Sequence, residues 1–86
     1  MILLRKVTSA DSSAITGTTV LRKLYWENPT NAGDTVVIQD GSANEQITLR
    51  CESANQSQVI DFNPEGLRIA GYKVSTLASG NLYIYG

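Results

Sequence analysis

The sequence predicts a single all-β domain over residues 1–86, with the architecture of an antiparallel β-sandwich of about seven or eight short strands. Short runs of β-branched, aliphatic and aromatic residues alternate with clusters of Gly, Pro, Asn, Asp and Ser, at a spacing of roughly 8 to 12 residues. No stretch has the apolar periodicity of an amphipathic helix, and no repeat or linker divides the chain. The predicted strands differ in length, which favours a sandwich over a barrel.

Residues 1–17 form either an N-terminal arm or a first strand followed by a loop. Ile2-Leu3-Leu4 is apolar but does not alternate with polar residues. Residues 9–13 are polar, and the β-branched residues and the glycine at positions 15–19 disfavour a helix. We therefore expect a loop here and the next strand from Thr18.

The stretch from Thr18 to Gln39 has the pattern of a strand, a reversal and a second strand. Its loop, at residues 28–34, contains Pro29, which restricts the backbone, and Gly33, which allows a positive φ. Alternation along the first strand defines an expected core face, made of Val20, Leu24 and Trp26. The opposite face carries Leu21, Lys23, Tyr25 and Glu27.

Two more strands are expected in the middle of the chain. Asp40-Gly41 is a tight-turn dipeptide that closes a hairpin. The return strand, residues 45–52, has the cleanest two-residue alternation of the sequence, and its expected core face is Ile47, Leu49 and Cys51. Residues 58–62 form a short strand, and a turn follows at residues 63–66 with Pro64 at its second position.

The C-terminal part predicts a long strand and then a short one. The long strand covers Leu67–Leu77, and Gly71 in its middle indicates a bulge or a bend. Its inward side chains are Leu67 and Ile69 before the bend, and the inward set resumes near Val74. Residues 82–85 close the domain, with Leu82 and Ile84 on the core face and Tyr83 and Tyr85 on the other.

The residue types argue against an enzyme. The chain has no histidine, which excludes Ser-His-Asp and Cys-His nucleophile systems and imidazole metal sites. Cys51 is the only cysteine, so it cannot form an intrachain disulfide, and its strand pattern predicts a buried core thiol. Acidic residues at strand ends are expected to accept hydrogen bonds within their own turns. No cofactor and no metal is expected.

Charge and hydropathy exclude two classes of partner. The net charge is −1, and the basic residues do not cluster as nucleic-acid binding requires. No segment approaches the roughly 20 apolar residues of a membrane span, and the N-terminus lacks the pattern of a signal peptide. We therefore expect a protein that is made in a cytoplasm and binds neither nucleic acid nor membrane.

Two groups of residues are candidates for an interface between subunits. The N-terminal segment Met1–Thr8, with Ile2, Leu3 and Leu4, is expected to add a strand to a neighbour, so that its deletion abolishes assembly and leaves the fold. Tyr83 and Tyr85 supply large aromatic area with a polar end. These two tyrosines bury in a partner subunit, lie on a partly covered sheet face within one subunit, or stack on sugar rings.

Several segments from Val20 to Gly86 resemble small all-β proteins encoded in the structural gene clusters of tailed phages. The resemblance rests on Leu24–Ile38 with Asp40-Gly41, Gly66-Leu67-Arg68-Ile69, Gly71-Tyr72, Ser75-Thr76-Leu77, Ser79-Gly80 and Leu82-Tyr83-Ile84-Tyr85. It implies a virion part, first of all a capsid decoration (cement) protein, with a tail or neck component as the next choice.

On this view the chain assembles as a homo-oligomer, expected to be a trimer, and its other partner is the major capsid protein or another virion protein. The location would be the virion, after synthesis in the host cytoplasm. A carbohydrate-binding module is the rival expectation from another class of function. It would need acidic and amide side chains beside the aromatic ones.

Overall fold

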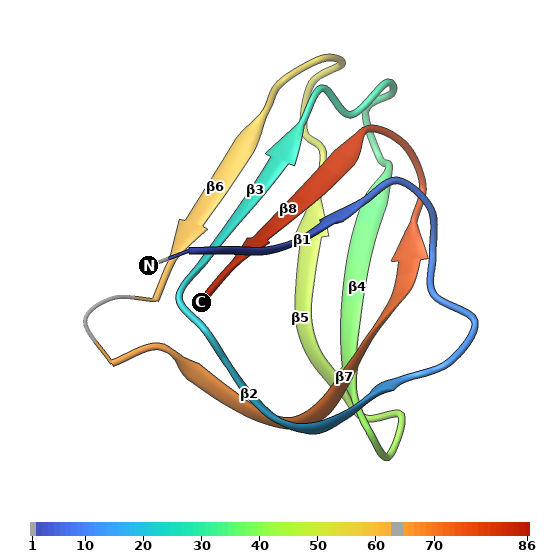
Figure 1. Ribbon diagram of the computed structural model, residues 1–86. Helices are drawn as coiled ribbons and strands as arrows, with labels where there is room; N and C mark the ends of the chain where they lie inside the picture. The colour runs from blue at the N-terminus through green and yellow to red at the C-terminus, as the bar shows by residue number, and fades with distance from the viewer. Residues whose placement is uncertain (1, 63–64) are drawn as a thin grey trace.

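The computed structural model describes residues 2–62 and 65–86, and these form two antiparallel four-stranded sheets packed face to face (Figure 1). The strands are β1 (Leu3–Val7), β2 (Ile15–Leu21), β3 (Lys23–Glu27), β4 (Thr35–Asp40), β5 (Glu45–Arg50), β6 (Gln58–Asp61), β7 (Leu67–Leu77) and β8 (Asn81–Tyr85). No helix occurs within the described ranges, so none there is long and apolar enough to cross a membrane. The predicted all-β sandwich is confirmed.

The strands pair in a nested order. β1 pairs with β8, β2 with β7, β3 with β6 and β4 with β5, all antiparallel. Additional pairing of β3 with β8 and of β4 with β7 divides this long hairpin into two sheets, β1-β8-β3-β6 and β2-β7-β4-β5. An eight-stranded double sheet wound in this way is a jelly roll.

The core lies between the two sheets and is built by the two-residue alternation of the strands. On β5, Ile47 and Leu49 are buried, as is Cys51 directly after the strand, and on β8 Leu82 and Ile84 are buried, as predicted. The largest fully buried side chains include Trp26, Leu21, Leu24, Ile38, Leu82, Ile84, Val36 and Val74. Removing this apolar area from water is the main source of stability.

Gly71 marks the predicted bend in β7. Its φ is +71°, a conformation that favours glycine, and the buried side changes there from the odd-numbered Ile69 to the even-numbered Tyr72 and Val74. The turn predicted at residues 63–66 includes two residues, 63 and 64, that lie outside the described ranges. Beside them, the Gly66 N–H donates to the Phe62 carbonyl at 2.7 Å.

The chain passes from one sheet to the other at Arg22, and this corrects one predicted core face. A single strand was expected from Thr18 to Glu27, but the structure has β2 in one sheet and β3 in the other. The Arg22 N–H donates to the Tyr85 carbonyl, and the Arg22 carbonyl accepts from the Phe62 N–H, both at 2.8 Å. Because the alternation shifts at this corner, Leu21 is fully buried and Val20 lies partly exposed.

The prediction of a loop up to Gly17 is also wrong, since β2 begins at Ile15. Gly17 has a φ of +88°, and the register against β7 shifts between Ile15 and Thr18. A bulge therefore lets the edge strand continue through the glycine.

The four edge strands are irregular or short. The registers of β1, β2 and β5 each shift by an extra residue on the edge strand: between Leu3 and Arg5, between Ile15 and Thr18, and between Glu45 and Ile47. β6 has only four residues. Bulges and short edges hinder pairing with another chain, so these four edges are poor templates for the addition of a strand.

Candidate interaction surface

The outer face of the sheet β1-β8-β3-β6 brings aromatic and lysine side chains together. The register places Tyr83 of β8 beside Lys6 of β1 and Tyr25 of β3, and it places Tyr85 beside Lys23. We call this surface the tyrosine face, and its side chains are Leu3, Lys6, Lys23, Tyr25, Glu27, Val59, Asp61, Asn81, Tyr83 and Tyr85. It points toward the viewer in Figure 1.

Ring contacts hold the aromatic side chains of this face in place. The rings of Tyr25 and Tyr83 stack, with centroids 5.7 Å apart and planes inclined by 26°. The Lys6 Nζ lies over the Tyr83 ring at 5.6 Å from its centroid, and the Lys23 Nζ lies over the Tyr85 ring at 5.4 Å. Each cation–π contact at an exposed site is worth about 0.5–1 kcal/mol. Together with the ring stacking, these contacts favour the side-chain positions seen in the structure.

An acid and an amide lie beside the stacked rings. The Tyr83 hydroxyl donates to Glu27 Oε1 at 3.2 Å, and the Asn81 side-chain amide donates to the same oxygen at 3.3 Å. A sugar site would use such groups. However, Glu27 Oε1 already accepts both of these hydrogen bonds, and lysine ammonium groups lie over the rings of Tyr83 and Tyr85 on which a sugar would stack.

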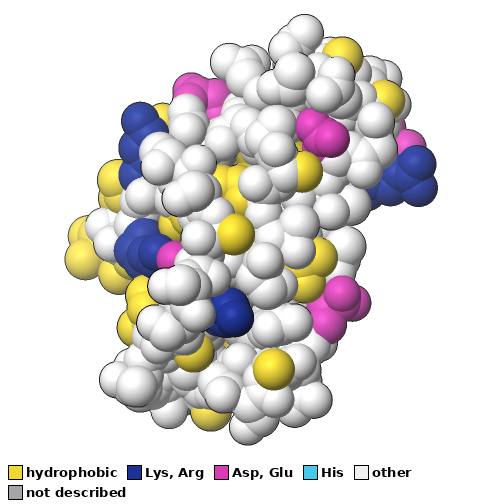
Figure 2. All heavy atoms as spheres, turned by 90° about the vertical axis from the view of Figure 1, so that its right-hand side faces the viewer, with side chains coloured by type: hydrophobic (Ala, Val, Ile, Leu, Met, Phe, Trp, Pro, Cys, Tyr) yellow, Lys and Arg dark blue, Asp and Glu magenta, His cyan; other side chains and the backbone are white. Residues whose placement is uncertain are grey.

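Exposed apolar side chains lie at both margins of the face. Leu3 on β1 is 49% exposed and Val59 on β6 is 55% exposed. Ile2, 68% exposed, extends the sheet through two hydrogen bonds with Gly86, and Leu4, 41% exposed, lies against Gly86. Figure 2 shows yellow and dark blue side chains gathered along its left-hand edge, the side that faces the viewer in Figure 1.

Leu3, Tyr83 and Tyr85, three of the five predicted interface residues, thus share one face, and Ile2 and Leu4 lie at its edge. The sequence did not predict that Tyr25, Lys6 and Lys23 also belong to this face, because only the strand order places them beside Tyr83 and Tyr85. Leu3–Val7 pairs with β8 of the same chain, and Val7 is buried at 3% exposure. Of the two alternatives for this segment, the structure contains the strand. Removing residues 1–8 would therefore damage the fold, contrary to the sequence-based expectation.

A polar cluster, which we call the Asp11 clasp, joins β1 to β7. Arg5 donates from Nη1 and Nη2 to the Asp11 carboxylate, at 3.0 and 2.7 Å. The Asp11 N–H donates to the Val74 carbonyl at 2.8 Å, and the Val74 N–H donates back to Asp11 Oδ2 at 3.0 Å. The Arg5 guanidinium also lies over the Tyr72 ring, 5.6 Å from its centroid. Asp11 thus takes up the hydrogen bonds of Val74 on β7, just beyond the residues of β7 that pair with β2.

The clasp lowers the pKa of Asp11. The main cause is the hydrogen bonding from Arg5, with a further contribution from the Val74 N–H, and these outweigh the opposing effect of burial. The contact between Asp11 and Val74 could not be predicted from the sequence, because the two residues are 63 positions apart and meet only when the sheets are assembled.

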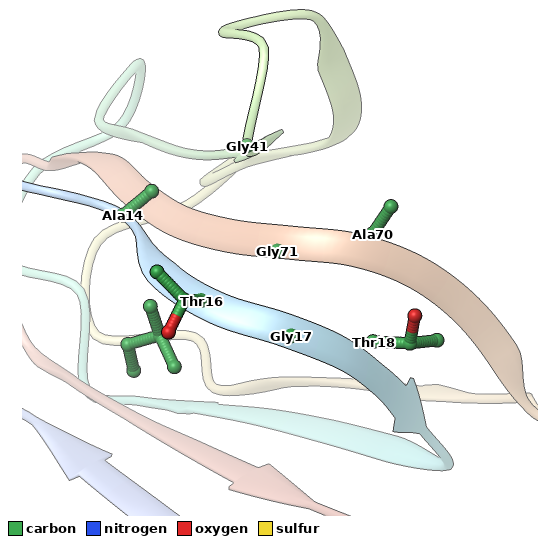
Figure 3. A pocket seen from close by; sticks show the side chains of 8 residues that line it. Ala14, Thr16, Gly17, Thr18, Gly41, Ala70 and Gly71 are labelled. Atoms are coloured by element: carbon green, nitrogen blue, oxygen red, sulfur yellow. The ribbon is translucent and has the colours of Figure 1, made fainter.

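A shallow pocket of about 300 Å³ lies on the other sheet (Figure 3). It is lined by residues 14–18, Gly41, Ala70 and Gly71. The hairpin tip meets the bend of β7 here, where the Gly41 N–H donates to the Ala70 carbonyl at 3.0 Å. None of the lining residues carries an ionisable side chain, so the lining holds no base that could activate the hydroxyls of Thr16 and Thr18.

Other candidates for chemistry are accounted for by local contacts. The Cys51 thiol is fully buried and donates to the Ser53 carbonyl at 2.9 Å, as expected of a core thiol. The Asp40 carboxylate accepts from the backbone of Ser42 and Asn44 and from the Gln46 side chain within its own hairpin. Within residues 2–62 and 65–86, no three Cys, Asp or Glu side chains form a group that could hold a metal ion.

Comparisons with protein-family models, with curated proteins and with solved structures found no match for the chain. The fold and the tyrosine face are therefore the features of the molecule that bear on its function.

Proposed function

We propose that this chain is a non-enzymatic structural protein of a phage virion, a capsid decoration (cement) protein that binds the head through its tyrosine face. The observation that supports the proposal is the ordered layer of tyrosines with exposed apolar side chains at its margins. Tyrosine is enriched where proteins meet, because it supplies contact area with little entropy to lose. The phage context comes from the resemblance of the turns and the terminal strand. Jelly rolls occur in viral capsid and lectin domains, although a fold alone does not define a function.

The size of the face favours binding by several linked copies. A sheet of four strands, each of about five residues, covers on the order of 300 Å². A stable protein interface needs about 800 Å² from each partner. One copy would therefore bind weakly, whereas a trimer on a repeating shell gains affinity from the linkage of its sites. A tail, neck or other virion lattice would use the same face in the same way.

A carbohydrate-binding module is the second candidate, and the position of Glu27 and Asn81 beside Tyr83 favours it. Lysines over the Tyr83 and Tyr85 rings weigh against it, since a sugar would have to displace them.

Replacing both Tyr83 and Tyr85 with alanine is expected to weaken binding to the head about tenfold or more, because two ordered aromatic anchors are lost from the contact. The measurement is co-sedimentation with heads assembled from the major capsid protein that the same genome encodes. A glycan array, probed with the same proteins, tests the second candidate.

The matched control replaces Val37 and Thr48 with alanine, because these two residues pair on the other sheet. Its head binding should equal that of the unaltered protein. If the tyrosine variant sediments with heads as the control does, the proposed binding face is wrong. Loss of glycan binding in the tyrosine variant, without any head binding by the unaltered protein, would favour the carbohydrate module.

A further inference from the structure

We propose that the partner of the tyrosine face presents a pair of carboxylates opposite β8, and that Lys6 and Lys23 select this partner. The inference rests on the proposed function and specifies the chemistry of the surface that is bound.

Both ammonium groups are centred on the same strand. Lys6 extends from β1 over Tyr83, and Lys23 extends from β3 over Tyr85, so a positively charged ammonium group lies over each tyrosine ring of β8. The carboxylates of the face, Glu27 and Asp61, lie on β3 and β6 instead. Asp61 is the register partner of Lys23, and Glu27 accepts from the Tyr83 hydroxyl. Both carboxylates therefore come from the β3–β6 side of β8, whereas the two ammonium groups lie over its tyrosine rings.

A partner that covers β8 must remove water from these ammonium groups. Such desolvation is costly unless each charge meets an opposite charge with good geometry. Displacing the lysines sideways would also forfeit the cation–π contacts that order the rings. A carboxylate above each lysine resolves both costs, because the ammonium stays in place and gains an ion pair in a less polar setting.

The apolar margins of the face specify the partner further. The leucine and valine at the margins call for apolar side chains around that acidic pair.

The test replaces both Lys6 and Lys23 with glutamate and measures co-sedimentation with the same heads in about 50 mM salt, where the screening length exceeds about 10 Å. We expect binding to fall about tenfold or more, and Lys6→Arg with Lys23→Arg to retain it. The matched control is Arg50→Glu with Arg68→Glu, because both arginines are exposed on the other sheet and the change in net charge is the same. Binding of the unaltered protein should also weaken as salt is raised.

The outcomes separate this inference from the proposed function. Suppose that the Lys6→Glu, Lys23→Glu variant binds as well as the Arg50→Glu, Arg68→Glu control does, while the Tyr83→Ala, Tyr85→Ala variant fails to bind. The carboxylate pair is then refuted and the virion proposal stands. If the unaltered protein does not bind heads at all, both are overturned. Circular dichroism checks folding, and if the glutamate variant is unfolded, Lys6→Gln with Lys23→Gln is judged by the same comparison.

Discussion

Trp26→Ala is expected to destabilise the protein by about 3–5 kcal/mol, a large share of the 5–15 kcal/mol typical of a domain. Trp26 is the largest of the fully buried side chains and lies on β3 between the two sheets. Its indole Nε1 donates to the Ser79 carbonyl at 2.8 Å, which anchors the turn between β7 and β8. Alanine would leave a cavity and would remove the donor from that carbonyl.

The measurement is urea unfolding followed by far-ultraviolet circular dichroism, since Trp26 is the only tryptophan and its replacement removes the usual fluorescence signal. Trp26→Phe keeps most of the packing but not the donor, so its cost should be smaller, about 1–3 kcal/mol. Tyr25→Ala, on the outer side of the same strand, is the surface control. A cost for Trp26→Ala no greater than that of Tyr25→Ala would contradict the packing described here.

Asp11→Ala is expected to cost about 2–4 kcal/mol near neutral pH. The change breaks a bidentate, partly buried ion pair with Arg5 and leaves the Val74 N–H without its carboxylate acceptor. Asp11→Asn retains an oxygen for the Val74 N–H and loses only the charge, so it should cost less than alanine. Equal stability of the alanine variant and the unaltered protein in urea unfolding would show that the clasp contributes nothing.

The clasp also makes stability depend on pH in a defined direction. The pKa of Asp11 is lower in the folded protein than the value of about 3.9 in an unfolded chain. The ionised Asp11 therefore contributes its full stabilisation of the fold at any pH above the pKa of the unfolded chain. The stabilisation is lost as the pH falls through the lower pKa of the folded state. The difference in unfolding free energy between the unaltered protein and Asp11→Asn should therefore shrink in acid. Asp40, whose pKa is also lowered, affects both proteins equally. A difference that stays constant down to acid pH would refute the linkage.

Features that depend on neighbouring residues could be predicted from the sequence. The buried alternation of Ile47, Leu49 and Cys51 and the bend at Gly71 both follow from local pattern and glycine chemistry. The corner at Arg22 could not be predicted in this way, because only the assembled structure shows that the residues before and after Arg22 belong to different sheets. A run of β-type residues looks continuous whether or not it changes sheets.

The same distinction applies to the candidate surface. Alternation along the last strand placed Tyr83 and Tyr85 on one face, and their burial pattern agrees. Their neighbours Tyr25, Lys6 and Lys23 come from β3 and β1, which are far from β8 in the sequence. The strand order was therefore needed to find them. The position of the exposed N-terminal leucines beside the tyrosines likewise follows from the pairing of the first strand with the last.

The nested pairing of the strands also sets an expected order of folding. Among the four nested pairs, only β4 and β5 are joined by a short connection, residues 41–44, whereas β1 and β8 lie at opposite ends of the sequence. Closing a long loop costs more entropy than closing a short one, and each pair formed shortens the loop that the next pair must close. We therefore expect the hairpin β4–β5 to form first and β1–β8 last, with slow folding overall. Pulsed hydrogen exchange should protect the amides of β4 and β5 before those of β1, and the reverse order would contradict this zipping from the centre outward.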